Sequence, residues 1–123
     1  MRLESLVGGV PEVVGPETPI ADAAALMLDT DRDAVAVVGR AGLIGICTSR
    51  DIVRAVAACA EPAHAAVADW MTEGPDTVGP DVPAEEASQW LLEAGYRHLP
   101  VMDGEELLGI VDVRDLLWAM TNR

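Results

Sequence analysis

The sequence predicts an α/β fold of the α+β kind, built from two pseudo-symmetric copies of one unit with the order strand, helix, strand, strand, helix. Two observations lead to this prediction. The chain aligns with itself without gaps at a shift of 64 residues, with 13 identities in the 48 positions compared. Within each copy, apolar runs of strand length alternate with stretches of helix-forming residues. A repeat that spans the chain indicates one supersecondary unit used twice.

The identities concentrate at turn residues and at the centres of the expected strands. Val14-Gly15-Pro16 aligns with Val78-Gly79-Pro80, and Pro19 aligns with Pro83. Further along, the aligned pairs are Gly45-Ile46 with Gly109-Ile110 and Arg50-Asp51 with Arg114-Asp115.

In both copies a short extended piece, 12–15 or 76–79, precedes the first helix. A proline opens that helix, because the missing N–H group would be unpaired there in any case. In the second copy its inner face is expected at Ala87, Trp90, Leu91 and Ala94. Trp70, just before the second copy, is expected to be a packing residue, since large aromatic side chains dominate the cores of small domains.

Two apolar runs follow the first helix in each copy and are expected to form a hairpin, at 35–38 with 43–47 and at 99–102 with 107–111. The pair Asp103-Gly104 is typical of its tight turn. A second helix begins at Thr48 or Asp112. Its inner face is expected at Ile52, Val53 and Val56 in the first copy and at Leu116, Leu117 and Met120 in the second.

These boundaries assign residues 1–60 to the first repeat, 61–66 to a linker and 67–123 to the second repeat. A lone unit of about 60 residues buries only roughly 60% of its surface and is marginally stable. Its sheet would be covered on one side only, so the two repeats must pack sheet to sheet or helix to helix to close the core.

The charge of the chain restricts its partners. There are 21 acidic and 8 basic residues, all of the latter arginine, and the net charge is −13. Binding to nucleic acid or anionic lipid depends on basic side chains, so neither partner is expected. No apolar run is long enough to span a bilayer, and the N-terminus does not resemble a secretory signal. Together with two cysteines that fit no disulfide framework, this predicts a cytoplasmic protein.

Four segments of the second copy, taken in order, resemble the cystathionine-beta-synthase (CBS) domain: Trp70-Met71-Thr72, Thr77–Pro80, Arg97–Val101 and Gly109–Asp115. The first copy carries the companion motif Gly45–Asp51. The resemblance covers nearly the whole chain, and two such domains in tandem form a Bateman module.

The resemblance implies a regulatory module and not an enzyme. Similar proteins pair their repeats sheet to sheet, hold adenosyl ligands in two clefts, and often form disc-shaped homodimers. The implied ligands are AMP, ADP, ATP, S-adenosylmethionine or NAD-type molecules, with no required cofactor, and the implied partner is an effector protein that the sequence does not identify. The alternative is a module of the same fold without a nucleotide, acting in dimerisation or protein interaction.

The resemblance also implies the site residues, carried over by position. An acid would hold the ribose hydroxyls, a hydroxyl would lie near the phosphates, and the extended piece and residues before the hairpin would enclose the adenine. The first cleft would use Val13, Val14, Val35, Thr48, Arg50 and Asp51, and the second Thr77, Val78, His98, Arg114 and Asp115.

Elementary chemistry allows two interpretations of these helix starts. A helix N-terminus offers unpaired N–H groups and a positive dipole to a phosphate, and a carboxylate can accept two ribose hydroxyls. The same residue types, from Thr48 to Asp51 and from Asp112 to Asp115, form a capping box that needs no ligand. Asp112 departs from the family's hydroxyl, and its charge would oppose a polyphosphate.

The remaining candidates for chemistry are weaker. Cys47, Cys59, His64 and His98 match no zinc spacing, so no metal site is predicted. No nucleophile and base pair can be named, so no catalytic residue is predicted. With few basic residues in the chain, AMP or S-adenosylmethionine is favoured over ATP.

Overall fold

The structure is a computed structural model, and it describes residues 1–122. This part of the chain contains four α-helices, two short 3-10 helices and two sheets. In chain order the elements are η1 (Leu3–Ser5), β1 (Val13–Val14), α1 (Ile20–Thr30), β2 (Ala34–Gly39), β3 (Gly42–Thr48), α2 (Ser49–Ala57), η2 (Val67–Asp69), β4 (Thr72–Glu73), α3 (Ala84–Ala94), β5 (His98–Asp103), β6 (Glu106–Asp112) and α4 (Val113–Thr121). The predicted order of strands and helices is confirmed in the first copy.

The chain forms two compact units. The first unit is Glu12–Pro75, and the second unit combines Met1–Pro11 with the chain from Asp76 onward. Each contains a hairpin and two α-helices, and each has its own core.

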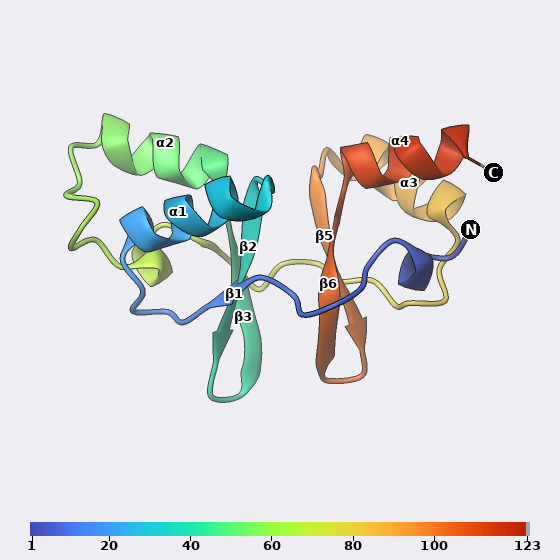
Figure 1. Cartoon of the computed structure of the whole chain (residues 1–123), viewed down its shortest axis with the longest axis horizontal. Coiled ribbons are helices and arrows are strands. Elements are labelled where there is room, and N and C mark those ends of the chain that lie inside the picture. Colours follow the sequence, from blue (N-terminus) through green and yellow to red (C-terminus); the bar gives the residue numbers. More distant parts are fainter. Residues whose placement is uncertain (123) are drawn as a thin grey trace. The chain divides into compact units, whose positions relative to one another are not determined.

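The first unit holds a four-stranded sheet in the order β1-β2-β3-β4. β1 is parallel to β2, while β3 is antiparallel to both β2 and β4. Helices α1 and α2 lie together on one side of these strands (Figure 1). The core between helices and sheet contains Ile20, Ala23, Met27, Val35, Val37, Cys47, Ala55 and Val67. Trp70 packs against this core, as predicted.

The second unit is built around the antiparallel hairpin of β5 and β6. Helices α3 and α4 cover it, and buried Leu91, Leu99 and Leu116 are part of its core. The extended piece expected at 76–79 is reduced to one residue of parallel pairing, Val78 with Val101. The Val78 N–H donates to the Pro100 carbonyl at 3.0 Å, and the Met102 N–H donates to the Val78 carbonyl at 2.8 Å.

The two compact units do not have the same boundaries as the two sequence repeats, because the segment before each repeat packs with the other one. Helix α3 has Pro83 as its N-cap, which offers no side-chain acceptor, and the Ala84 N–H donates instead to the carbonyl of Met1 at 2.8 Å. Helix α1 is capped in the same way by the segment before the second repeat, because the Ile20 N–H donates to the Ala65 carbonyl at 2.9 Å. Helix ends require such acceptors. Residues 1–11 therefore belong to the second unit, and the predicted linker, 61–66, supplies the cap of the first.

In each unit, a glycine in the second strand of the hairpin allows a neighbouring segment of the chain to pass close to that strand. A Cβ atom at Gly45 would lie 2.8 Å from the Thr72 carbonyl oxygen and against the Met71 side chain. At the matching position in the second unit, a Cβ atom on Gly109 would lie 3.0 Å from the side chain of Val7. Both glycines thus leave room for a neighbouring strand or loop, which explains why they are identical in the two repeats.

Three of the predicted helix faces are wrong in part. In α3 Ala87 and Leu91 are buried as expected, but Trp90 is 40% exposed and Ala94 is exposed. In α2 Asp51 and Ala55 are buried and Ile52 packs against the core, whereas Val53 and Val56 are 65% and 58% exposed. In α4 Leu116 is buried as expected, but Ala119 is buried and Leu117 is 63% exposed. Helices covering a small sheet present only a narrow stripe to it, and small residues sit at the closest approach. Among residues 1–122, no helix has the length and apolar character required to cross a membrane.

Candidate functional site

The N-terminus of α2 is closed by a capping box between Thr48 and Asp51. The Thr48 hydroxyl oxygen accepts a hydrogen bond from the Asp51 N–H at 3.3 Å, and the Asp51 Oδ2 atom accepts one from the Thr48 N–H at 2.9 Å. The capping interpretation is therefore confirmed for these residues. Ligand binding by the same two residues stays a prediction.

The Asp51 carboxylate is buried, and both of its oxygens accept hydrogen bonds. Asp51 is 5% exposed, and its Oδ1 atom accepts from Arg54 Nη1 at 2.8 Å. Its Oδ2 atom also accepts from the Thr48 hydroxyl at 3.2 Å. The Arg54 guanidinium lies 5.7 Å from the centroid of the Trp70 ring. A ribose hydroxyl approaching Asp51 would have to share these oxygens with the cap or displace the arginine.

The N-terminus of α4 carries a capping box made of two carboxylates. The Asp115 N–H donates to Asp112 Oδ1, and the Asp112 N–H donates to Asp115 Oδ2, both at 2.9 Å. Asp112 is 4% exposed, and its Oδ2 atom lies 3.8 Å from Arg114 Nε. Capping is confirmed here as well. The helix end that attracts anions is thus already occupied by a carboxylate.

The other predicted residues of the first site lie around the same sheet. Val13 and Val14 form β1, and Val13 pairs with Ala36 of β2. Two residues earlier on β2, Ala34 pairs with Thr48, so β1 and the start of α2 lie near one end of this sheet. Val35 is fully buried in the core, so its side chain supports the sheet and is not part of the surface. Arg50 is exposed in the first turn of α2.

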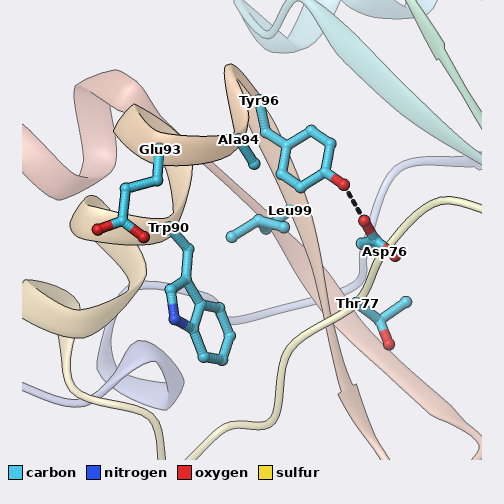
Figure 2. Close-up of a pocket in the computed structure, with 7 residues that line it drawn as sticks. All are labelled: Asp76, Thr77, Trp90, Glu93, Ala94, Tyr96 and Leu99. Carbon is cyan, nitrogen blue, oxygen red and sulfur yellow. Dashed lines mark hydrogen bonds between the residues drawn. The ribbon is translucent and has the colours of Figure 1, made fainter.

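A pocket of about 320 Å³ opens in the second unit, and Figure 2 shows the residues that line it. They come from the segment before Val78, from the end of α3 and from the start of β5: Asp76, Thr77, Trp90, Glu93, Ala94, Tyr96 and Leu99. In Figure 2 the Leu99 side chain lies between the indole of Trp90 and the phenol of Tyr96. Two aromatic rings and two carboxylates therefore border one cavity.

The Tyr96 hydroxyl donates a hydrogen bond to the Asp76 carboxylate across the mouth of this pocket (Figure 2). This hydrogen bond, and next the negative charge of Asp76, raise the pKa of Tyr96 above its ordinary value. The pair ties the segment before Val78 to the residue that follows the left-handed C-cap Gly95 of α3.

Of the predicted residues of the second site, Thr77 lines this pocket. Val78 is buried, 4% exposed, in its bridge to Val101. His98 is half-buried at the start of β5, in register with Asp112 of β6, and Arg114 and Asp115 lie in the first turn of α4. Sequence reasoning missed Asp76, Trp90 and Tyr96. A signal was present, because the chain has only three Trp, one Tyr and no Phe, and two of these four aromatic residues lie at this pocket.

The two cysteines differ in environment. Cys47 is buried in the first core, and burial, followed by the charge of Asp51, raises the pKa of its thiol to about 12. Cys59 is exposed. A thiol with so high a pKa is protonated at neutral pH and is a poor nucleophile or metal ligand.

The family model for the CBS domain matches residues 7–58 and 67–122. The CBS domain-containing protein YhcV of Bacillus subtilis is 33% identical over 103 residues, which cover 84% of this chain and 74% of that protein. Other curated relatives are longer, and the chain spans 20% and 24% of the length of two of them.

Solved structures have the same fold. A CBS domain protein from Pyrobaculum aerophilum, complexed with AMP, has a TM-score of 0.85 at 20% identity over 100% of both chains. A CBS domain pair in complex with 5′-methylthioadenosine and S-adenosyl-L-methionine has a TM-score of 0.88 at 21% identity, over 98% of this chain and 96% of that one. The predicted fold of two repeats, each mixing helices and strands, is confirmed.

Proposed function

The chain belongs to the CBS domain family, of which it carries two tandem repeats, and from this premise we propose that it is a regulatory module that binds an adenosyl ligand and signals to a partner protein. The observation that carries this proposal is the pocket of about 320 Å³ in the second unit. Its volume lies at the lower end of the range of roughly 300–1,000 Å³ found for small-molecule sites.

The walls of the pocket suit a purine base. Trp90 and Tyr96 are 40% and 41% exposed, so their ring faces are accessible. Stacking of a base on an aromatic ring contributes about 1–3 kcal/mol. Thr77 offers a hydroxyl and Leu99 an apolar floor. We assign the second site to these residues together with the predicted Val78, His98, Arg114 and Asp115.

For the first site we retain the predicted set, Val13, Val14, Val35, Thr48, Arg50 and Asp51. Since the Val35 side chain is buried, its contribution would come from the main chain of β2. The exposed Arg50, in the first turn of α2, would supply positive charge for a phosphate, whereas the Asp51 N–H at this helix end already donates to Thr48. AMP, ADP, ATP, S-adenosylmethionine and NAD-type molecules are the ligands to compare, with AMP or S-adenosylmethionine expected to bind more tightly than ATP.

Isothermal titration calorimetry with these ligands tests the proposal. We expect saturable heat for at least one of them, and a weaker affinity in Trp90→Ala if the second pocket is used. Glu105→Ala, on the distant hairpin turn, is a control that should bind as the wild type does. Absence of saturable binding by every ligand would refute the sensor function.

A second candidate function, self-association, is favoured by an apolar groove of about 260 Å³ between α3 and α4. Leu92 and Leu117 on its rim are 85% and 63% exposed. Leu28 and Val53 stand at the matching positions of the first unit, 64 residues earlier, and are 83% and 65% exposed. A second copy of the chain would meet each of these faces with a like apolar surface.

Sedimentation equilibrium separates this function from ligand binding. We expect the wild type to be a homodimer and the Leu92→Glu, Leu117→Glu double variant to be a monomer with unchanged ligand affinity. A monomeric wild type at high micromolar concentration would contradict the self-association.

A further inference from the structure

The pocket of the second unit has an unusual charge balance. Among the seven residues that line it in the described part of the chain, Asp76 and Glu93 are acidic and none is basic. Both are exposed, and in Figure 2 the Asp76 carboxylate lies against the Tyr96 hydroxyl while Glu93 lies beside Trp90 on the other side. Carboxylates next to aromatic faces attract cations and repel anions, because the ring faces carry the negative side of a quadrupole.

The first repeat carries the same two acidic charges at the matching positions, Glu12 and Asp29, and differs at the aromatic positions. At the shift of 64 residues, Arg32 stands where the second repeat has Tyr96, and Leu26 stands where it has Trp90. The helix after the hairpin is capped by the neutral Thr48 in one repeat and by the carboxylate of Asp112 in the other. Of these differences, the replacement of Arg32 by Tyr96 and that of Thr48 by Asp112 each make the second repeat more negative, whereas Arg97 stands where the first repeat has Asp33.

In the second unit, the N-terminus of α4 does not offset the negative charge of the pocket. The positive end of a helix dipole can hold a phosphate when its N–H groups are open. In α4 the Asp115 N–H donates to Asp112, and a capping carboxylate neutralises the dipole end. Arg114 Nε lies 3.8 Å from Asp112 Oδ2 and offsets part of its charge, so the fixed negative charges that a phosphate would meet in the pocket lining are Asp76 and Glu93.

We propose that the pocket of the second repeat selects adenosyl ligands by charge, taking those whose 5′ group is an uncharged thioether or a cationic sulfonium and rejecting those with a 5′ phosphate. The selection rests on the proposed function, since it assumes that an adenosyl group is bound. The base stacks on the exposed aromatic side chains, and the negative charges of Asp76 and Glu93 in the lining disfavour a 5′ phosphate.

The test is an amide-resolved NMR titration, which reports each unit separately. Methylthioadenosine, S-adenosylmethionine and AMP are titrated in turn, and the shifts of Thr77, Ala94 and Leu99 report the second pocket. We expect methylthioadenosine to bind there at least about tenfold more tightly than AMP at low salt. Raising the salt concentration should narrow this difference, because salt screens the repulsion of exposed charges.

Variants that neutralise the two carboxylates test whether their charge causes the selection against AMP. In Asp76→Asn, Glu93→Gln we expect the AMP affinity of this pocket to rise about tenfold while that of methylthioadenosine changes less than about twofold. The matched control, Glu105→Gln, Glu106→Gln, removes the same charge from the hairpin turn and should leave both affinities unchanged.

The outcomes separate the two proposals. If AMP binds the second pocket of the wild type as tightly as methylthioadenosine, or if both double variants raise the AMP affinity equally, the charge selection is wrong. If ligands shift only amides of the first unit, adenosyl binding stands and the selection is overturned. If none binds either unit, the adenosyl function itself fails.

Discussion

Replacing Asp51 by alanine tests the physical role of the most connected side chain of the candidate site. The substitution removes the acceptor of the Thr48 N–H, the N3 half of the capping box and the partner of Arg54. Loss of a cap costs about 1 kcal/mol, and a buried donor left without an acceptor costs about 1–3 kcal/mol. Because the Arg54 side chain is 55% exposed, the ion pair adds at most roughly 0.5–1 kcal/mol. We therefore expect the free energy of unfolding to fall by about 2–5 kcal/mol.

Equilibrium urea unfolding, followed by tryptophan fluorescence and far-ultraviolet circular dichroism, measures this change, provided that the two probes give one transition. Arg54→Ala is the first control, because it removes the ion pair and keeps the cap. Asp115→Ala is the second, because it opens the equivalent box of α4, where Trp118 stands in place of Arg54. The difference between Asp51→Ala and Arg54→Ala gives the contribution of the capping interactions apart from the ion pair.

The same variant also distinguishes capping from ligand binding. If Asp51 acts only as a cap, ligand affinity measured well below the unfolding transition stays unchanged while stability falls. If it also holds a ribose, affinity falls in Asp51→Ala and is retained in Arg54→Ala. A loss of stability below about 0.5 kcal/mol, the usual range for a plain surface substitution, would refute the reasoning from the capping box.

Three further predictions follow from local environments. In the native protein at pH 8, a thiol reagent should modify Cys59 and not Cys47, because burial raises the pKa of the Cys47 thiol to about 12. The protonated Cys47 thiol stabilises the fold below pH about 9, and this contribution is lost as the pH rises towards 12. Modification of both thiols at equal rates would contradict this. Gly45→Ala should lower the free energy of unfolding by about 1–3 kcal/mol in urea titrations, because its Cβ would press on backbone; an unchanged midpoint would refute the close approach. Absorbance titration should give Tyr96 a pKa above its ordinary value. The contribution of Tyr96 to stability should be present at lower pH and lost as the pH rises through this pKa. Asp76→Asn should return the pKa of Tyr96 to the ordinary value, and an unchanged pKa in this variant would exclude the hydrogen bond.

The repeat, the order of elements and both capping boxes could be predicted because they depend on local chemistry. Prolines, glycines and the threonine or aspartate before a helix act within a few residues of the chain, so the sequence displays them directly. The inner faces of α2 and α4 could not be predicted in the same way. Both helices carry apolar residues on more than one face, and only the tertiary packing decides that Ala55 and Ala119 are buried while Val53 and Leu117 are exposed.

The pocket of the second unit escaped prediction for a related reason. Trp90 has the spacing of an inner-face residue of α3, yet it is 40% exposed, because Ala87 and Leu91 already fill the stripe that faces the hairpin. Its ring therefore turns to the edge of the helix. Tyr96 reaches the same edge only because Gly95 ends α3 in a left-handed conformation, with φ of 74°. Neither fact is visible in the spacing of apolar residues.

The pairing of residues 1–11 with the second unit shows why a repeat in sequence need not be a unit of packing. Arg2 and Leu3 match Ala66 and Val67 at the shift of 64 residues, so the two lead-in segments are equivalent, and the spacing alone does not say which repeat either one caps. Main-chain hydrogen bonds show which repeat each segment contacts. The N–H of the fully buried Leu3 donates to the Val82 carbonyl at 2.9 Å. The Val67 N–H donates to the Thr18 carbonyl at 2.8 Å. Each repeat thus takes the cap of its first helix, and one residue of its core, from the segment that precedes the other. A fragment cut at the sequence boundary, 67–123, would lack Leu3 and the acceptor for the Ala84 N–H, so its instability would reflect the missing cap and not a weakness of the repeat itself.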